Sequence, residues 1–506
     1  MKALLMHPQR NFDPQQALPP QAPALTQDLE LGTLWQAMAG EDKFVLGVVR
    51  QALLCSLAND VPTILHRQAV LRDGLRQPAL VRELYALAVE AMEGKRKFHI
   101  GYFMNYPSSV LRSSIELMQF FVGMLKRLRS FAETHAAAFE SQGYTDLFAM
   151  LRSEFNDDYI ASIRGHLVEL KFDAGVLLSA ELGAGNQGTK HVLRLLRDKR
   201  PNWLRRLLGQ GPQGHTFRLA DRDEAGARAL SELQDRGIDQ VANALAQSAD
   251  HILGFFDMLR TELAFYVGAL NLNDQLVQRG APVCLPEPQA IGSRRQRCAD
   301  LRDACLVLSM RQAVVGNSVD ADGRSLVVIT GANQGGKSSF LRAVGLAQLM
   351  MQAGLFVTAV SFSAELCAGL FTHYKREEDT TMKSGKLDEE LARLSEIADS
   401  IAPGCMLLCN ESFASTNERE GSEIARQTVH AMLERRIKVI FVTHMYGFAH
   451  ELCLAQRPDT LFLRAERRED GTRTFRLVEG EPLSTSYGKD LYAQVFAVDP
   501  VPAQPA

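Results

Sequence analysis

The chain of 506 residues is too long for one hydrophobic core, and its composition, 46% apolar and 23% charged, is that of a globular protein. These values exclude a disordered or fibrous chain and indicate about two to four domains. The formal net charge is −3, so a nucleic-acid partner would have to be bound by a local basic patch and not by the overall field.

The cysteines and the apolar segments argue against a secreted or membrane protein. The eight cysteines form no C-x-x-C pair and no zinc-type cluster with histidine, so we interpret them as reduced core thiols. The N-terminal sequence has no apolar stretch of signal-peptide length, and the uncharged run at 343–364 is interrupted by Gln348, Gln352 and Gly354. We expect a cytoplasmic protein, associated with the nucleoid when bound to DNA, and no membrane partner.

The first half of the chain predicts a helical region. Residues 1–40 are rich in Pro and Gln and predict a loose segment, apart from one short helix within 29–40. Apolar residues then recur at spacings of three and four, which marks the buried faces of helices. The predicted helices cover 44–58, 64–76, 78–93, 108–135 and 224–272.

A small mixed insertion at about 166–222 interrupts this helical region, with strand-like segments at 167–182 and 215–223. The sequence between the two segments carries seven basic residues around Trp203: Lys190, Arg194, Arg197, Lys199, Arg200, Arg205 and Arg206. A basic segment of this kind suits DNA phosphates, with an affinity that falls as salt rises. A solvated helix face with Trp203 packed beneath it explains the same residues equally well.

The strongest motif is a phosphate-binding loop that matches G-x-x-x-x-G-K-[ST] between a short buried strand and a helix. Glycines let backbone N–H groups turn toward phosphates, and the helix dipole adds to this effect. We predict that Lys337 binds the β- and γ-phosphates of ATP and that Ser338 ligates Mg²⁺. The predicted nucleotide-binding residues are Gly331, Ala332, Asn333, Gln334, Gly335, Gly336, Lys337, Ser338 and Ser339.

Two further strand ends complete the predicted site. The apolar run 405–409 ends on Asn410 and Glu411, where a Walker B strand carries its acids, so Glu411 is the candidate base that orients the attacking water. Asn410 would help to hold Mg²⁺ through water. The strand at 437–443 leads into His444, the candidate sensor of the γ-phosphate. The alternatives are a solvated turn residue for Glu411 and an ordinary strand-end histidine for His444.

Together these segments resemble the ATPase domain of the MutS family. The segment ITGANQGGKSSFLRAVGLAQLMMQAGLFVTA is similar to the family's phosphate loop and helix, MLLCNESFASTNEREG to its Walker B strand and signature turn, and FVTHMYGFAHEL to its ATH-x-x-EL sequence. Val315-Gly316-Asn317 resembles V-P-N-D, DTTMKSGKLDEELARLSEIA the segment between the two Walker motifs, and Ser486-Tyr487-Gly488 a late SYG motif. The resemblance is specific over about 285–495 and looser over 40–285, where LRTELAFYVGALNL is the best local match.

The resemblance implies a multidomain fold. An all-helical core and lever region at 41–285, with the insertion as a clamp-like tip, is expected to precede an α/β P-loop ATPase domain at 286–498 and a tail at 499–506. The sequence at 461–480 predicts a hairpin at the edge of the ATPase sheet, turning at 469–471.

The resemblance also implies partners and roles. The ATPase domain should form a homodimer in which Ser415, Thr416 and Asn417 of one protomer complete the other's site, and Asn317 should approach the adenine. The helical arms would clamp double-stranded or structured DNA, mismatched or damaged DNA included, in repair or recombination. The alternative role of the three turn residues is an N-cap for the helix at 420–435.

Several departures from the family limit these expectations. The chain has no room before residue 40 for the mismatch-reading domain or its connector, and no Phe-x-Glu wedge near its start. Phe413, Ala414 and Ser415 stand where small Gly residues are usual, and Asn410 replaces the Walker B Asp. We therefore expect slow hydrolysis and keep two alternatives. One is an ATPase of the ABC or SMC type, against which the missing LSGGQ-type signature and long heptad arms argue. The other is a hydrolysis-impaired, nucleotide-switched interaction protein that does not act on DNA.

Overall fold

The computed structural model describes residues 1–98, 106–172, 175–186, 188–194, 218–220, 222–376, 385–468 and 472–483. The chain divides into two compact units. One consists of Met1–Ala3, Arg82–Phe139 and Thr145–Arg260, and the other of Leu4–Val81, Glu140–Tyr144 and Thr261–Ala506. The units do not follow the predicted boundary at residue 285, because the first helices of the chain pack with the C-terminal part. Within the described ranges we find no helix whose length and apolar character would let it span a membrane.

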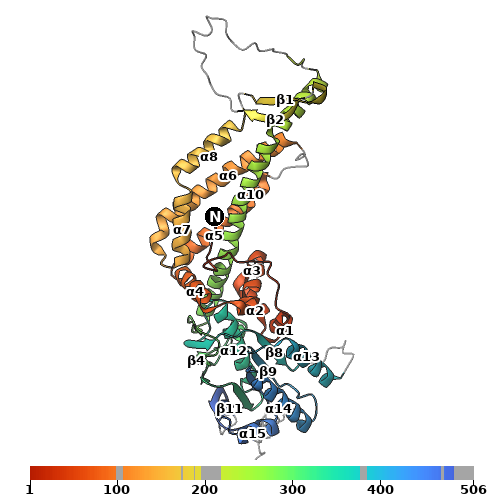
Figure 1. Ribbon diagram of the computed structural model, residues 1–506. Coiled ribbons are helices and arrows are strands. Elements are labelled where there is room, and N and C mark those ends of the chain that lie inside the picture. Colours follow the sequence, from red (N-terminus) through yellow and green to blue (C-terminus); the bar gives the residue numbers. More distant parts are fainter. Residues whose placement is uncertain are drawn as a thin grey trace, which may run out of the picture. The chain divides into compact units, whose positions relative to one another are not determined.

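The first unit, called here the helical unit, is built on long amphipathic helices (Figure 1). They are α5 (Pro78–Phe98), α6 (Pro107–His135), α7 (Gln142–Glu154), α8 (Asp157–Glu169) and α10 (Glu224–Gln278), some of which continue into the second unit. Leu111, Ile115 and Met118 of α6 are buried at spacings of three and four. Phe121 of α6 stacks on Phe256 of α10 with ring centroids 5.9 Å apart. The helices predicted at 108–135 and 224–272 are therefore confirmed.

A two-stranded hairpin follows α8. Its strands, β1 (Leu177–Leu182) and β2 (Gly188–Arg194), pair antiparallel, and Gly185 in the connection η3 (Ala184–Asn186) has φ 73°, which glycine adopts without strain. Two predictions need correction. Helix α8 extends through the start of the segment predicted as strand, and the returning strand is β2 and not 215–223, of which the described residues form no strand. Pairing close in sequence has a small loop-closure cost, which favours the short hairpin.

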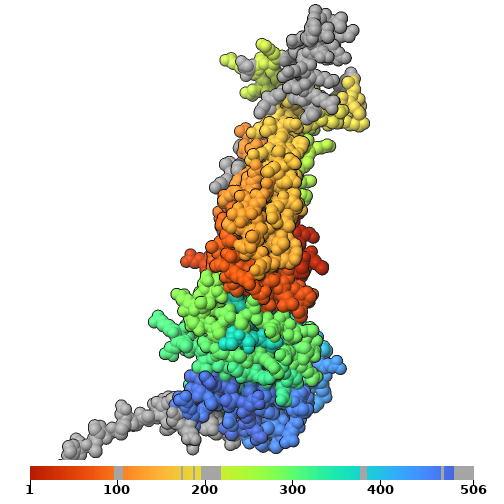
Figure 2. Space-filling view, turned by 90° about the vertical axis from the view of Figure 1, so that its left-hand side faces the viewer, coloured from red at the N-terminus to blue at the C-terminus, as the bar shows by residue number. Residues whose placement is uncertain are grey.

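The second unit, called here the α/β unit, begins with short helices. They are α1 (Ala22–Asp28), α2 (Leu31–Ala39), α3 (Lys43–Leu54), the 3₁₀ turn η1 (Ser56–Ala58) and α4 (Val61–Arg76). Asp60 is the N-cap of α4 and accepts the Thr63 N–H at 2.9 Å. Figure 2 shows the red N-terminal surface adjoining the green surface of later residues. Ser56 Oγ accordingly donates to the Leu349 carbonyl oxygen at 3.3 Å.

The prediction that residues 1–40 form a loose segment is wrong. Leu5, Met6 and Phe12 are buried, and the Glu262 carboxylate in α10 accepts their backbone N–H groups at 2.6, 3.2 and 2.8 Å. Glu262 lies 250 or more positions later in the sequence. Composition near the N-terminus therefore could not indicate that this segment is held in the core.

We expect Glu262→Ala to lower the free energy of unfolding by about 3–5 kcal/mol, because it leaves three buried N–H donors without an acceptor. Glu262→Gln keeps one acceptor oxygen and should cost less. The measurement is urea denaturation of the purified variants. Glu423→Ala, which removes an exposed carboxylate paired with Arg426 at 2.7 Å, is the matched control and should change stability little. Equal stability of Glu262→Ala and the parent would contradict this account.

Six strands form the central sheet of the α/β unit, in the order β12-β11-β6-β10-β9-β8. They are β6 (Leu326–Gly331), β8 (Leu370–Tyr374), β9 (Met406–Asn410), β10 (Lys438–Val442), β11 (Thr460–Arg467) and β12 (Arg473–Glu479). All neighbours pair in parallel except β11 and β12, which form an antiparallel pair at the edge. The hairpin predicted at 461–480 is confirmed, although its turn at 469–471 lies outside the described residues.

Helices cover both faces of this sheet. They are α12 (Lys337–Gln352), α13 (Lys386–Ser400), α14 (Glu418–Glu434) and α15 (Tyr446–Leu454). Helix α12 packs so closely that a Cβ on Gly345 would lie 2.8 Å from the Leu408 side chain. Residues of α14 and α15 pack on Leu407 and Phe441, whose side chains point to the other face. The C-terminal part is therefore a layered α/β domain, as predicted.

The α/β unit also contains a smaller, four-stranded sheet. Its strands are β3 (Glu287–Gln289), β4 (Gln296–Leu301), β5 (Asn317–Asp320) and β7 (Ser361–Glu365), in the order β3-β7-β4-β5. Between β4 and β5 the chain forms the short helix α11 (Ala304–Ser309), capped by Asp303. The segment from β4 to β5 thereby becomes one wall of the cavity described next.

Candidate nucleotide site

The loop between β6 and α12 has the backbone geometry that its glycines predict. Gly331 has φ 107° and Gly336 has φ 89°, values that glycine adopts readily and other residues rarely do. A Cβ on Gly335 would lie 2.8 Å from the Ala332 carbonyl oxygen, so space also requires glycine. The loop leads directly into the first residue of α12, and a helix N-terminus favours bound anions.

Lys337 fills the inside of this loop. Its side chain is buried, and its Nζ donates to the carbonyl oxygens of Gly331 and Ala332, both at 3.0 Å. Burial lowers the pKa of Lys337, and the nearby Glu411 carboxylate opposes this effect. An anion entering the loop would replace two neutral carbonyl partners by a charged one, which forms stronger hydrogen bonds.

The two residues predicted to hold Mg²⁺ lie together. Ser338 Oγ donates to Asn410 Oδ1 at 2.8 Å across the ends of α12 and β9. A hydroxyl and an amide oxygen are hard ligands that suit Mg²⁺, which keeps most of its shell for waters and substrate phosphates. Among the described residues, no three His, Cys, Asp or Glu side chains gather in a way that could hold a metal. The Ser338 hydroxyl and the Asn410 amide oxygen, as hard ligands, fit a Mg²⁺ ion that arrives with phosphates.

Glu411 and His444 meet at the ends of two neighbouring strands. Glu411 Oε2 lies 3.8 Å from His444 Nδ1, and the Glu411 N–H donates to the Val442 carbonyl oxygen at 2.9 Å. The backbone of Glu411 has φ 53°, a strained value of the kind found at functional sites. His444 holds the pKa of Glu411 below its usual range, against the raising effect of burial, and Lys337 and Lys375 add to the lowering. The carboxylate is thus ionised at neutral pH and can accept a proton.

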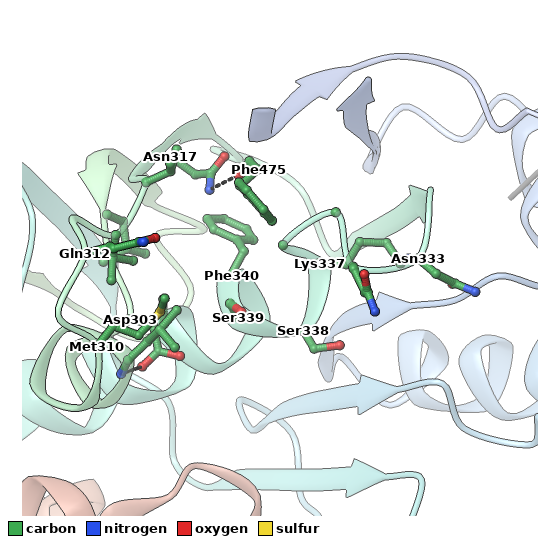
Figure 3. A pocket seen from close by; sticks show the side chains of 18 of the residues that line it. Asp303, Met310, Gln312, Asn317, Asn333, Lys337, Ser338, Ser339, Phe340 and Phe475 are labelled. Carbon is green, nitrogen blue, oxygen red and sulfur yellow. Dashed lines mark hydrogen bonds between the residues drawn. The ribbon is translucent and has the colours of Figure 1, made fainter. Parts of the chain in front are cut away.

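These groups face one cavity of about 520 Å³ (Figure 3). The predicted residues that line it are Asn317, Asn333, Gln334, Gly335, Gly336, Lys337, Ser338, Ser339, Glu411 and His444. Gly331, Ala332 and Asn410 do not line it; the first two accept from Lys337 and the third accepts from Ser338. A volume of this size accommodates a small-molecule ligand.

Asn317, predicted to approach the adenine, has its side-chain amide already occupied. Its Nδ2 donates to the Phe475 carbonyl oxygen at 3.2 Å, and its Oδ1 accepts the Leu477 N–H at 2.7 Å. These bonds fix β12 over the cavity. Asn317 therefore lines the cavity, but its side-chain amide hydrogen-bonds the backbone of β12.

Sequence reasoning missed the apolar wall of the cavity. Phe340, three residues after Lys337 on α12, and Phe475 of β12 lie near each other beside Asn317 in Figure 3. Phe475 is 48% exposed and has φ 59°. Met310 and Gln312, which follow α11, extend this wall. The helical spacing could have indicated Phe340, whereas the place of Phe475 depends on the register of the edge hairpin.

The turn predicted to act in the partner's site is bonded within its own chain. Asn417 Oδ1 accepts the Glu420 N–H at 3.0 Å and so caps α14, as the alternative interpretation predicts. Ser415 Oγ donates to Glu390 at 2.8 Å, and Thr416 Oγ1 donates to Glu420 at 2.8 Å.

Phe413 occupies one of the positions where the family usually has glycine. Its φ is 63°, which explains the preference for glycine. Phe413 is held there because its buried ring stacks on His373 at 5.3 Å and its N–H donates to Glu390 at 2.8 Å.

Only two of the seven basic residues predicted to contact DNA lie among the described residues. Lys190 Nζ pairs with Glu181 at 2.8 Å, and Arg194 Nε donates to Ser179 Oγ at 2.9 Å, all on the exposed β1–β2 hairpin. Arg197, Lys199, Arg200, Arg205 and Arg206, like Ser486-Tyr487-Gly488, lie outside the described residues.

Two family models match different parts of the chain. Residues 327–502 match the family model described as MutS domain V, and residues 59–279 match the one described as the MutS2 N-terminal domain. The chain belongs to the MutS family. The MutS2 match also covers most of the helical region, where the resemblance of the sequence to MutS was looser.

MutS relatives match over part of their length. The DNA mismatch repair protein MutS of Thermus aquaticus is 30% identical over 189 residues, 37% of this chain and 23% of that protein. For MutS of Chloroflexus aurantiacus the identity is 26% over 235 residues, 45% of this chain and 24% of that protein. MutS protein homolog 4 of Mus musculus is 24% identical over 188 residues, 36% and 20% of the two chains. The chain thus spans about a quarter or less of the length of these MutS relatives.

Proposed function

We propose that this MutS-family chain is an ATPase that binds ATP and Mg²⁺ in the cavity beside the β6–α12 loop. The observation that carries the proposal is the meeting of Lys337, the Ser338–Asn410 pair and the Glu411–His444 pair at adjacent strand ends. Lys337 would bind the β- and γ-phosphates, and Ser338 with Asn410 would hold the metal. Bound Mg²⁺ would neutralise charge on the phosphates. Glu411 would orient water and accept its proton, with His444 orienting Glu411 and sensing the γ-phosphate.

Asn410→Asp is expected to lower the Mg²⁺ concentration that gives half-maximal ATPase activity by about tenfold, because a carboxylate adds a charge to the position that Ser338 contacts. The Mg²⁺ dependence of steady-state hydrolysis measures this. Asn410→Ala, which removes the acceptor, should shift the requirement in the opposite direction. An unchanged requirement in Asn410→Asp would show that this side chain takes no part in holding the metal.

We also propose that the chain binds double-stranded or structured DNA through the helical unit and acts in DNA repair or recombination. The protein would be cytoplasmic and would associate with the nucleoid when it is bound to DNA. Support comes from the family, whose relatives include proteins named for DNA mismatch repair, and from the exposed Lys190 and Arg194. Of their partners, Glu181 is exposed and Ser179 is half-buried, and surface contacts of this kind are weak enough for phosphates to displace them. The clamp-like role of the insertion remains part of this proposal.

The test is a DNA-binding titration across salt, with and without a non-hydrolysable ATP analogue. The proposal expects affinity to fall steeply with salt, and the slope to decrease by about one for each phosphate-contacting residue removed, for example in Lys190→Ala. Affinity should also differ between the two nucleotide states. No DNA binding in either state would favour the alternative, a nucleotide-switched interaction protein.

Dimerisation of the ATPase domain is the last part of the proposal. The side chains of Ser415, Thr416 and Asn417 have partners in their own chain, so we propose that the N-terminal turn of α14 as a whole faces the partner's nucleotide. The positive end of a helix dipole suits a γ-phosphate. Sedimentation with and without the ATP analogue measures the oligomeric state, and a monomer under both conditions would contradict this part.

A further inference from the structure

A second cavity lies at the opposite end of the parallel strands of the central sheet from the candidate nucleotide site. It measures about 680 Å³ and is lined at the amino ends of the parallel strands by Ser325 before β6, Met406 of β9, Lys438 of β10 and Asp459 before β11. The nucleotide site lies at the carboxyl ends of the same strands. A strand of five residues spans roughly 16 Å, so the two cavities are separate.

Lys438 contributes a buried ammonium group to this cavity. The residue is 8% exposed, and its Nζ donates no hydrogen bond to any described residue. The Glu365 carboxylate lies 3.8 Å away, but its other oxygen accepts the N–H groups of Gly292 and Arg294, both at 3.0 Å. Burial lowers the pKa of Lys438 to about 8, and Glu365 opposes the effect. A desolvated ammonium without hydrogen-bond partners is costly unless something else binds it.

The other charged groups of the cavity are mostly cationic. Arg294, Arg324, Arg436 and Arg457 line it with Lys438, against the carboxylates of Glu365 and Asp459. Asp459 is engaged by Arg457 at 3.1 and 3.2 Å. Within the described residues, Arg294 and Arg436 form no ion pair, so positive charge remains for an anion.

The backbone of Arg436 is a further observation in favour of an anion site. It follows the end of α14 with φ 58°, at a position where helices usually place glycine. The Ile437 N–H donates to the Met432 carbonyl oxygen at 3.0 Å, which closes the helix end. An arginine is strained there, and its exposed guanidinium lines the cavity.

We propose that this cavity binds a phosphate-bearing small molecule. Lys438 would provide the buried contact, and Arg436, Arg294 and Arg324 the planar donors that match phosphate oxygens. Apolar residues on the remaining walls, such as Ile291 and Leu433, would contact the body of the ligand. The volume is within the range of small-molecule sites. This site is independent of the proposed ATPase activity.

The test is calorimetric titration of inorganic phosphate, at constant ionic strength, into the full chain carrying Lys337→Ala. That background removes the phosphate contact of the candidate nucleotide site. We expect phosphate to bind, and Lys438→Gln and Arg436→Gly to weaken the affinity by about tenfold each. Arg435→Ala is the matched control, because exposed Arg435 donates to the Ala398 carbonyl oxygen and does not line the cavity; its affinity should stay unchanged.

Thermal denaturation without phosphate separates ligand binding from a structural role. Arg436→Gly should be at least as stable as its parent, because glycine relieves the positive φ. Loss of phosphate affinity together with retained stability supports the proposal, even if Lys438→Gln fails to fold. Absence of phosphate binding in the Lys337→Ala background, or equal affinity in Arg436→Gly and Arg435→Ala, would overturn it.

Discussion

Replacing Lys337 by alanine is expected to weaken ATP binding by at least about 100-fold and to abolish measurable hydrolysis. Lys337 is the one buried cation of the β6–α12 loop, and it is held there by the carbonyl oxygens of Gly331 and Ala332 at 3.0 Å. Without it, the phosphates would lose their charged contact inside the loop. Calorimetric titration of ATP in the presence of Mg²⁺ measures the affinity directly.

The same variant also removes two hydrogen bonds within the loop, so its folding needs a control. Lys337→Met keeps all but the last atom of the side chain's length and removes its charge. Both variants should retain the parent's free energy of unfolding, measured in urea, within about 0.5 kcal/mol, because the glycines of the loop determine its backbone. Tight ATP binding by a folded Lys337→Met protein would show that the charge is not needed and that the cavity has been assigned wrongly.

Glu411→Gln is expected to reduce hydrolysis by about 10²- to 10³-fold while leaving ATP affinity within about twofold. The amide keeps the shape of the side chain and the contact with His444, but it cannot accept a proton from water. Single-turnover hydrolysis and ATP binding, measured on one preparation, separate the two effects. Glu451→Gln serves as the control, since this exposed carboxylate on α15 does not line the cavity. If Glu411→Gln hydrolysed ATP at the parental rate, Glu411 would have no catalytic role and would be an ordinary turn residue.

The pKa of Glu411 sets the pH range of this effect. His444 and the nearby lysines hold it below its usual range, so the folded protein keeps the carboxylate ionised until the pH falls through that lowered value. Activity that depends on the Glu411 carboxylate is therefore present at neutral pH and lost only in acid. We expect no loss of activity between pH 8 and pH 6 from protonation of Glu411.

The phosphate loop and the strand ends could be predicted because each is local in the sequence. Glycines at positive φ, a lysine at the first helical position and polar residues after buried strands follow from short-range chemistry. Parallel pairing then brings Asn410, Glu411 and His444 to one edge of the sheet, and the predicted residues meet there.

The remaining features depend on long-range contacts. Residues 1–40 looked loose because the acceptor of their buried N–H groups, Glu262, lies far away in the sequence. Phe475 reaches the cavity only through the register of β11 and β12. In the sequence, Lys438 is indistinguishable from an ordinary strand residue, because only the structure shows that it is buried and lines a cavity. Sequence patterns indicate the period of a helix or strand, but they do not indicate which distant element supplies the hydrogen-bond or packing partner of a given residue.

The central claim, a DNA-coupled ATPase of the MutS family, is tested most directly by steady-state ATP hydrolysis with and without duplex, mismatched and branched DNA. The same measurements on Lys337→Ala provide the background. We predict slow hydrolysis that changes with at least one of these DNAs and disappears in the Lys337 variant. Hydrolysis that does not respond to any DNA, or that persists in Lys337→Ala, would contradict the account.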